Sequence, residues 1–254
     1  MEMDRVYLEN IRIAELDFVL KKYRNIFLQN SSILEVGAGS GWQARELTSR
    51  GYDVQAVDIA ASTYSAENIF PVQQYDGEHL PFADASFDII FSSNVLEHVD
   101  NLKCLLQEMH RVLKNGGKCI HLVPTAQWRI WTSLAHYGYM IKFIGMKFIP
   151  FKPIEGNASS HVQPDGLKYH WWKYIIPIRH GERGNFLTET YYFSKTYWKS
   201  VFSSSSWDIF VNETNELFYT GYGIFDYPSS IPLRKMASKY LGSACHVFIL
   251  EKKV

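Results

Sequence analysis

The segment that most limits the possible folds is residues 32–41, where a short apolar run leads directly into a glycine turn. Residues 32–36, Ser-Ile-Leu-Glu-Val, predict a short buried strand. Glycines then recur at alternate positions, Gly37, Gly39 and Gly41, and a helical pattern starts at Trp42. A strand, a glycine turn and a helix open a βαβ unit, in which a ligand lies over the turn. Glycine suits this turn because no side chain then separates the backbone from the ligand.

The residues around the glycines restrict the identity of the ligand. The dinucleotide-binding fingerprint needs a third glycine at position 42, where this chain has Trp42. Carboxylates stand at the tips of three predicted strands instead, namely Glu35, Asp58 and Asp76. Asp58 can accept both hydroxyls of a ribose, Asp76 can accept an adenine amino group, and Glu35 suits an ammonium group. The three acids together favour a cationic nucleoside with a free amino acid end.

Residues 31–124 resemble the core of the class I S-adenosylmethionine-dependent methyltransferases, in particular the type 11-like members. The resemblance rests on segments in matching order and spacing: Leu34–Gly41, Val57–Asp58, Asp76–Phe82, Phe87–Val99 and Glu108–Gly117. It implies a Rossmann-like α/β fold with a seven-stranded, mostly parallel sheet and helices on both faces. It also implies S-adenosylmethionine as the cofactor and a methyltransferase, EC 2.1.1.-, as the activity.

The resemblance further implies a set of cofactor-binding residues. Along the chain these are Glu35, Gly37, Ala38, Gly39, Gly41, Asp58, Ile59, Asp76, Gly77, Asn94 and Val95. The glycines let the backbone approach the methionine end, and Ile59 packs on the adenine. Asn94, just past the fourth strand, offers its carbonyl to the methionine amino group. Ordinary turn chemistry is the alternative for Asp76 and Asn94.

Hydrophobic periodicity predicts the elements of this core. An amphipathic helix is expected at 9–29, with packing as its role. Strands are expected near 32–36, 53–57, 71–75, 87–92 and 117–123, and helices near 41–50, 61–68 and 101–114. Residues 114–117, Lys-Asn-Gly-Gly, predict a helix stop followed by a turn. Short links between alternating strands and helices predict a parallel sheet covered on both faces.

The chain divides into an acidic half and a basic, aromatic half. Residues 1–124 carry 17 acidic, 11 basic and 12 aromatic side chains. Residues 125–254 carry 9 acidic, 15 basic and 27 aromatic side chains. Basic and aromatic residues together suit an anionic ligand, sugar rings or a membrane surface. We therefore expect three parts: 1–124, an N-terminal helix with the cofactor-binding core; 125–193, an inserted aromatic-rich substrate cap; and 194–254, a helix and the final strands that complete the sheet.

The second half contains further predicted elements. A helix is expected at 193–202 with Ser194 as its N-cap, strands at 207–211 and 246–251, and a second insertion at 216–242. Within the cap, no window of about eighteen residues is apolar and uncharged, so a membrane-spanning helix is not expected. Residues 128–152 are predicted to lie on a membrane, to cover a lipid-linked substrate, or to form a buried lid helix. Residues 153–170 predict a long loop.

Methyl transfer to a hydroxyl needs a base that accepts the hydroxyl proton. His98 follows the fourth strand near the expected methyl group, and packing at a helix start is the alternative. His180 and Glu182 lie in His180–Asn185, where a base, an acid, a cation and an amide stand between glycines. His180 can deprotonate the hydroxyl while Glu182 orients it or binds sugar hydroxyls, and a polar turn is the alternative. No set of histidines and cysteines has metal-ligand spacing, so no metal is expected.

The second half is similar to methyltransferases of bacterial surface-polysaccharide gene clusters. This similarity rests on Trp128–Thr132, His136–Tyr137, His180–Glu182, Asn185 and Thr188–Glu189. It implies O-methylation of a sugar hydroxyl in a surface glycan or its lipid-linked precursor. Methylation of a quinone or other lipid-like molecule is an alternative, and a non-catalytic S-adenosylmethionine-binding sensor or scaffold is an alternative of another class.

Composition also bears on partners and location. The basic residues form no dense patch and no RNA-binding module is recognisable, so a small-molecule or glycan substrate is expected rather than a nucleic acid. No signal peptide is recognisable, and the three cysteines have no CxxC spacing. Reduced thiols in a cytoplasmic protein are therefore expected, with the inner face of the membrane as the place of any peripheral contact.

Overall fold

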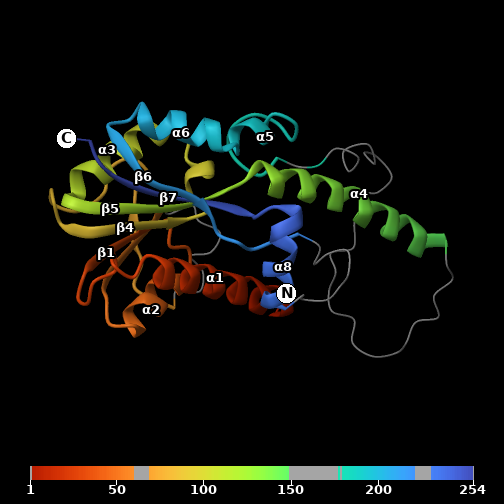
Figure 1. The fold of residues 1–254 in the computed structure, drawn as a ribbon, viewed down its shortest axis with the longest axis horizontal. Coiled ribbons are helices and arrows are strands. Elements are labelled where there is room, and N and C mark those ends of the chain that lie inside the picture. The colour runs from red at the N-terminus through yellow and green to blue at the C-terminus, as the bar shows by residue number, and fades with distance from the viewer. Residues whose placement is uncertain (1, 60–68, 149–176, 178, 221–229, 254) are drawn as a thin grey trace.

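A computed structural model describes residues 2–59, 69–148, 177, 179–220 and 230–253. One seven-stranded sheet runs through the molecule and carries helices on both faces (Figure 1). The strand order is β3-β2-β1-β4-β5-β7-β6. All neighbouring strands are parallel except β7, which is antiparallel to both β5 and β6. The predicted Rossmann-like α/β fold with a mostly parallel sheet is confirmed.

The strands form where apolar residues run or alternate. They are β1 (Ser32–Val36), β2 (Asp53–Ile59), β3 (Gln73–Tyr75), β4 (Phe87–Ser93), β5 (Leu113–Pro124), β6 (Trp207–Thr214) and β7 (Cys245–Lys252). Successive side chains of a strand point to opposite faces. Ile33 and Ile89 therefore enter one core layer, whereas Leu34 and Ile90 enter the other. Because β1, β2 and β4 are parallel, the residues that follow them meet at one edge of the sheet.

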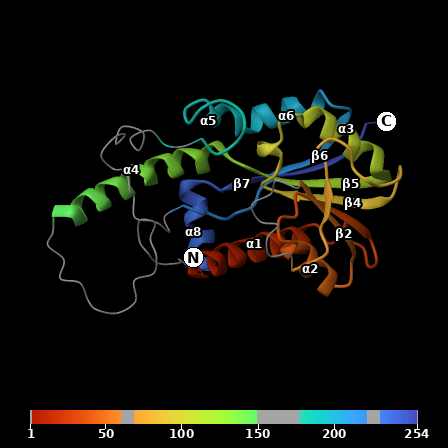
Figure 2. The same cartoon turned by 180° about the vertical axis from the view of Figure 1, so that it is seen from behind.

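Two pairs of helices cover the faces of the sheet. α1 (Glu2–Lys22) and α2 (Trp42–Ser49) lie on one face, and α3 (Leu102–Val112) and α6 (Lys195–Ser203) lie on the other, as Figure 2 shows from behind. Leu16 of α1 and Leu47 of α2 are fully buried in the first layer, and Trp198 of α6 is buried in the second. Ser194 caps α6 as predicted, because its side chain accepts a hydrogen bond from the Tyr197 N–H.

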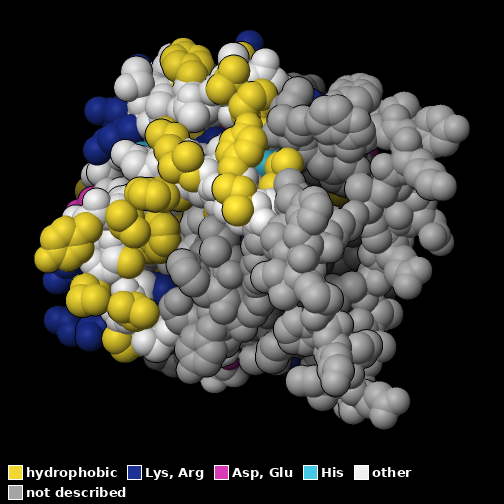
Figure 3. Space-filling view, turned by 90° about the vertical axis from the view of Figure 1, so that its right-hand side faces the viewer, with side chains coloured by type: hydrophobic (Ala, Val, Ile, Leu, Met, Phe, Trp, Pro, Cys, Tyr) yellow, Lys and Arg dark blue, Asp and Glu magenta, His cyan; other side chains and the backbone are white. Residues whose placement is uncertain are grey.

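Within the described residues, the second half of the chain adds three more helices. α4 (Ala126–Phe148) leaves the end of β5 and extends beyond the sheet, α5 (Glu189–Tyr192) is a single turn, and α8 (Ile231–Leu241) precedes β7 (Figure 1). The face toward which α4 extends carries a group of exposed hydrophobic side chains (Figure 3). Four exposed residues of α4 stand three or four positions apart and so share one side of the helix: Ile130, Leu134, Tyr137 and Ile141. Among the described helices, none combines the length and the apolar character needed to cross a bilayer.

Element boundaries differ from the sequence predictions at three places. The helix expected at 9–29 is α1, which ends at Lys22 and is followed by turns. Lys114–Gly117 is not a separate turn, because the backbone is already extended at Leu113 and β5 absorbs these residues as a register shift opposite Phe87 and Ile89. The expected insertion at 216–242 contains α8. The helix expected at 61–68 and the loop expected at 153–170 lie outside the described residues, and the division into core and cap stays a prediction.

Candidate active site

The turn after β1 brings bare backbone to the edge of the sheet. Gly37, Gly39 and Gly41 all have positive φ, at 75°, 57° and 79°. A Cβ atom on Gly37 would lie 2.4 Å from Cγ2 of Val95, so only glycine lets the turn after β1 approach the loop after β4. The N–H groups of Gly37 and Ala38 donate to the Val57 carbonyl at 2.9 and 3.1 Å. These contacts fix a short backbone cradle between β1, β2 and β4.

Asp58 in β2 is part of this cradle. Its Oδ2 accepts a hydrogen bond from the Gly39 N–H at 2.6 Å, and its Oδ1 accepts from the Ile59 N–H at 2.7 Å. Each carboxylate oxygen can accept a second hydrogen bond. The carboxylate is therefore held in one orientation and still has acceptor capacity for two hydroxyl groups, as the ribose prediction requires.

Glu35 lies beneath the cradle with its side chain buried. It is 2% exposed, and its carboxylate accepts a hydrogen bond from the Ala44 N–H in the first turn of α2. Its Oε2 has no hydrogen-bond partner within the part of the chain that the structure describes. Burial, together with the nearby negative charge of Asp58, raises the pKa of Glu35 to about 8. An unpaired buried carboxyl of this kind is suited to a cationic ligand.

The turn after β3 is more self-contained than predicted. Asp76 accepts hydrogen bonds from the N–H groups of Glu78 and His79 at 2.8 and 2.6 Å, and its Oδ2 lies 2.9 Å from His79 Nδ1. These bonds lower the pKa of Asp76 to about 2. A Cβ on Gly77 would be 3.5 Å from Ile59, whose side chain is 43% exposed. An apolar surface for an adenine is therefore present, while the contact of Asp76 with the adenine amino group stays a prediction.

The loop after β4 faces the glycine turn. Asn94 has a positive φ of 55°, and its N–H donates to the Leu122 carbonyl at 2.8 Å. Its side-chain Nδ2 donates to Ser93 Oγ at 3.1 Å, and its Oδ1 accepts from Cys245 Sγ at 3.4 Å. The side chain is thus engaged inside the sheet edge. Its predicted carbonyl contact with the methionine amino group is not tested by these bonds.

α1 does more than pack against the sheet. Arg12 Nη1 lies 2.6 Å from Oε2 of the buried Glu15 and donates to Ser93 Oγ at 3.3 Å. The other oxygen of Glu15 accepts from Asn215 Nδ2 at 2.9 Å. The first helix therefore places a charged pair directly against the end of β4, which the sequence pattern did not indicate.

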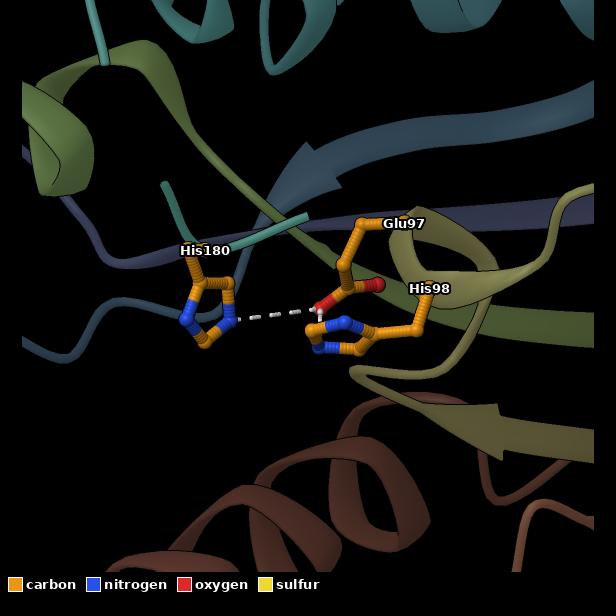
Figure 4. Close-up of side chains that lie close together, drawn as sticks. All are labelled: Glu97, His98 and His180. Atoms are coloured by element: carbon orange, nitrogen blue, oxygen red, sulfur yellow. Dashed lines mark ion pairs between the residues drawn. The ribbon is translucent and has the colours of Figure 1, made fainter. Parts of the chain in front are cut away.

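Glu97, His98 and His180, which we call the histidine cluster, come together just beyond the end of β4 (Figure 4). Glu97 and His98 belong to the 3₁₀ turn η2 (Leu96–His98), and both imidazole rings approach one carboxylate oxygen. His98 Nε2 is 3.8 Å and His180 Nε2 is 4.0 Å from Glu97 Oε1. Glu97 is 1% exposed, and neither of its oxygens has a hydrogen-bond partner among the described residues.

Burial shifts the proton affinities of the cluster in opposite directions. It raises the pKa of Glu97 to about 8, lowers the pKa of His180 to about 4 and lowers the pKa of His98. Both imidazoles are therefore neutral near pH 7 and keep a free lone pair. The two rings remain partly open to solvent, with 40% of the His98 side chain and 38% of the His180 side chain exposed.

A buried carboxylate holds the segment that carries His180. Glu189 Oε1 accepts hydrogen bonds from the N–H groups of His180 and Gly181 at 2.6 and 2.7 Å. Its Oε2 pairs with Arg129 Nε of α4 at 2.8 Å, and both side chains are buried. The Glu182 N–H donates to the Glu97 carbonyl at 3.0 Å, which docks the segment on η2. The position of His180 is thus set by residues far apart in the sequence.

Aromatic rings line the cluster on the α4 side. The Trp128 ring lies 4.7 Å from the His180 ring, and Phe193 lies 6.2 Å from both rings, between centroids. Glu182 is arranged differently from the prediction, because its carboxylate pairs with Arg179 at 2.9 Å rather than with either histidine. Its charge still favours the protonated form of His98. A direct role for Glu182 at the acceptor stays a prediction.

Known proteins match the part of the chain that builds this edge. Residues 34–121 match the Methyltransferase domain family, and this range includes the glycine turn, Asp58, Asp76 and η2. The chain contains a class I S-adenosylmethionine-dependent methyltransferase domain. S-adenosylmethionine is accordingly the cofactor of this domain.

Curated relatives share the methyltransferase domain over part of their length. A biotin biosynthesis bifunctional protein of Cellvibrio japonicus is 34% identical over 132 residues, 46% of this chain and 26% of that protein. A malonyl-[acyl-carrier protein] O-methyltransferase of Erwinia billingiae is 29% identical over 138 residues, 53% of this chain and 55% of that protein. A ubiquinone/menaquinone biosynthesis C-methyltransferase of Geotalea daltonii is 29% identical over 164 residues, 54% of this chain and 68% of that protein. The similarity to surface-polysaccharide methyltransferases receives no support from these three names.

Solved structures agree with the methyltransferase fold over most of the chain. An S-adenosylmethionine-dependent methyltransferase of Methanosarcina mazei superposes with a TM-score of 0.53 at 18% identity, covering 91% of this chain and 97% of that one. One from Mesorhizobium loti gives 0.52 at 17% identity, covering 93% and 100%. At these identities the likeness concerns the fold.

The carboxyl ends of β1, β2 and β4 and the residues that follow them, which include Gly37, Asp58 and Asn94, form one edge of the sheet that we call the cofactor edge. Its geometry fits S-adenosylmethionine. A Cβ at Gly37 would fill the cradle, so the cradle depends on backbone that is open to a ligand. The unpartnered oxygen of Glu35 suits the positive charge of the cofactor, and Asp58 has acceptor capacity for ribose hydroxyls. The predicted residues of the first, second and fourth strand ends therefore meet at one edge, as expected.

The sequence prediction missed three residues of the site. Glu97 lies within 4.0 Å of both predicted histidines, Glu189 holds His180, and Arg12 reaches the end of β4. Glu97 precedes His98 in the predicted segment, and Glu189 belongs to the surface-polysaccharide similarity. Both residues therefore stand in recognised segments, but the sequence alone assigns neither of them a function. Nothing in the sequence pattern of α1 distinguishes Arg12 from a surface arginine.

Proposed function

We propose that this chain transfers the methyl group of S-adenosylmethionine to a hydroxyl oxygen of an acceptor that binds beside the histidine cluster. The proposal rests mainly on the position of the cluster. Its η2 turn directly follows Asn94 and Val95, and its two neutral imidazoles are partly open to solvent. A methyl group presented at the glycine turn would then have Glu97, His98 and His180 on its acceptor side.

The chemistry divides between the two sides of the site. S-adenosylmethionine supplies a methyl carbon that its sulfonium already activates, so alignment and exclusion of water are the main tasks of the protein. Glu35 and Asp58 hold the donor in place. On the acceptor side the new oxygen–carbon bond forms as the carbon–sulfur bond breaks, and the hydroxyl must lose its proton. We assign this activation of the hydroxyl to the cluster, with His98 and His180 as the residues nearest the acceptor.

A sugar hydroxyl is the first acceptor that we propose, in a surface glycan or its lipid-linked precursor. Three residues of the surface-polysaccharide similarity lie next to His180: the Trp128 ring meets its ring edge-on, Glu189 accepts from its N–H, and Arg129 pairs with Glu189. An aromatic ring such as Trp128 also suits the apolar face of a sugar. The placement of these side chains supports the acceptor that the surface-polysaccharide similarity implies, namely a sugar hydroxyl. The support comes from these residues and not from overall sequence identity.

A quinol or another lipid-like hydroxyl is the second acceptor. It is favoured by a relative of Rickettsia akari that is named a ubiquinone biosynthesis O-methyltransferase, 29% identical over 124 residues, 44% of this chain and 49% of that protein. The exposed apolar side of α4, with Ile130, Leu134, Tyr137 and Ile141, also suits contact with a membrane surface. We therefore keep the proposal that residues 128–152 touch the inner face of a membrane, whichever acceptor is used.

The deciding experiment is transfer of labelled methyl groups by the purified chain to a panel of acceptors. The panel contains surface glycan extract, its lipid-linked precursor, a quinol and malonyl-acyl carrier protein, with Asp58→Ala as the cofactor-deficient control. Label on the glycan or precursor supports the first acceptor, and label on the quinol replaces it with the second. Label on malonyl-acyl carrier protein, whose acceptor group is a carboxyl, would reject a hydroxyl acceptor, and tight cofactor binding without transfer to any member of the panel would support the sensor or scaffold.

A further inference from the structure

The histidine cluster has the composition and closeness of a metal site. Glu97, His98 and His180 each offer one ligand atom, and these atoms lie within 4.8 Å of one another. The ligands come from two segments, η2 and the stretch held by Glu189, so the cluster exists only in the folded chain. Two imidazoles and one carboxylate form a ligand set that divalent transition metals accept, with coordination positions left open.

The Glu97 carboxylate provides an independent reason for a ligand at this place. Its side chain is fully buried, and neither oxygen has a hydrogen-bond partner among the described residues. A buried carboxylate without a partner is costly, and coordination to a metal ion is one of the ways in which such a group is satisfied. Both histidines turn a ring nitrogen to its Oε1 rather than away from it (Figure 4).

Neighbouring charges leave room for a cation. Arg12 is paired with Glu15, and Arg129 is paired with Glu189. Arg183 donates to the carbonyl groups of Leu96 and Val99 at the back of η2. These hydrogen bonds and ion pairs leave both Glu97 oxygens without a hydrogen-bond partner among the described residues, so they are available to a bound ion.

We propose that Glu97, His98 and His180 bind one divalent transition metal ion, which in turn binds the hydroxyl oxygen of the acceptor. The proposal rests on the function proposed above and specifies how its acceptor side works. The two histidines then act as ligands rather than as free bases. This departs from the expectation of no metal, which considered only spacing along the sequence.

The geometry needs only a small adjustment. Ligand atoms about 2.0–2.2 Å from a shared ion lie roughly 3–3.6 Å apart, so the two pairs with Glu97 at 3.8 and 4.0 Å must close by up to about 1 Å, and the pair of histidine nitrogens, within 4.8 Å, by up to about 1.8 Å. The exposed parts of both rings allow such a rotation, while Glu189 keeps the backbone of His180 fixed.

The ion would make the hydroxyl a better nucleophile. A bound divalent ion lowers the pKa of a coordinated hydroxyl, so its proton passes to solvent water near neutral pH. The oxygen then forms the bond to the methyl carbon as the carbon–sulfur bond breaks, and S-adenosylhomocysteine leaves. One ionised hydroxyl and the Glu97 carboxylate together neutralise the two charges of the ion.

Metal binding is tested directly and without turnover. The full chain is stripped with a chelator and titrated with Zn²⁺ by calorimetry, and with Co²⁺ by visible absorption. We expect one ion per chain, and Glu97→Gln and His180→Gln should each weaken binding at least about tenfold. His110→Gln, on α3 outside the site, is the matched control and should bind like the unaltered chain. Thermal unfolding of each variant checks that it is folded.

The outcomes separate this inference from the proposed function. Equal Zn²⁺ binding by the unaltered chain and Glu97→Gln would overturn the site. Methyl transfer that persists in chelator would overturn the role of the ion and return the hydroxyl proton to His180, while leaving the proposed function intact. Metal binding that depends on Glu97, without transfer to any hydroxyl, would support the site and reject the proposed function.

Discussion

The cofactor edge and the histidine cluster are adjacent but are built in opposite ways. At the cofactor edge, each turn directly follows its own strand, and the contacts are mostly backbone ones, as between Gly37 and Val57. The histidine cluster joins η2 to a distant segment and is held by buried charged side chains, above all Glu189 and Arg129. A disruptive substitution at the cofactor edge should therefore abolish cofactor binding. A substitution among the residues that hold His180 should lower the rate of methyl transfer and leave cofactor binding intact.

The largest effect is expected from Gly37→Ala. Alanine would be forced to a φ of 75°, and its Cβ would meet Val95 at 2.4 Å. Left-handed backbone and overpacking together should destabilise the fold by about 2–5 kcal/mol. Cofactor binding should be lost as well, because the loop after β4 must move away from the turn. Thermal unfolding and calorimetric titration with S-adenosylmethionine measure the two effects.

Gly116→Ala is the matched control for this change. Gly116 has nearly the same φ, 79°, but a Cβ there would have no heavy atom within 4 Å. Only the backbone term of about 1–2 kcal/mol should remain, with cofactor affinity unchanged. Similar losses in the two variants would show that the close approach of Gly37 to Val95 has no special importance.

Glu189→Gln should separate the two regions. Glutamine can still accept from the His180 and Gly181 N–H groups, but it removes the negative charge that Glu189 places beside the buried Arg129. Removal of one member of a buried ion pair costs about 3–5 kcal/mol. We expect local loosening of the His180 segment, a large fall in transfer rate and nearly unchanged cofactor affinity. An equal fall in cofactor affinity would contradict the separation.

Two further variants sharpen that test. Arg129→Met combined with Glu189→Gln removes both charges, so it should recover part of the stability that the single change loses. Glu251→Gln breaks the partly exposed pair with Lys118 and should change stability by less than about 1 kcal/mol. Stability lost equally at Glu251 and Glu189 would mean that burial of the second pair has no consequence.

The same contrast explains which parts of the site the sequence predicts. Strand, glycine turn and acid follow one another within a few residues, so Gly37 and Asp58 could be placed from spacing alone. Glu97 acquires its role only when a segment containing His180 folds onto η2, and no local pattern records that contact. Likewise, the register shift in β5 hides Lys114–Gly117 inside a strand, although the residues are typical of a turn.

Glu35 allows a pH test of the cofactor edge. Its folded-state pKa of about 8 lies above its unfolded value of 4.5, so ionisation costs stability as pH rises from about 5 to 8. Glu35→Gln removes this cost, and the variant should gain up to about 2–4 kcal/mol relative to the unaltered chain at pH 8, but little at pH 5. Chemical denaturation of the cofactor-free chain at both pH values measures it. A difference between the two proteins that does not change with pH would exclude the shifted carboxyl.

Asp58 and Asp76 give the finest comparison, since both are acids at neighbouring strand tips. Asp58→Ala should weaken S-adenosylmethionine binding by about 1–3 kcal/mol, because it removes the hydrogen bond from the Gly39 N–H and the charged hydrogen bonds that we predict to the ribose. Asp76→Ala should cost less, since that carboxylate already accepts from Glu78 and His79 within its own turn. Calorimetric titration of both variants decides between the roles. Unchanged affinity in Asp58→Ala would refute the ribose contact, and an equal loss in Asp76→Ala would restore Asp76 as an adenine ligand rather than a turn residue.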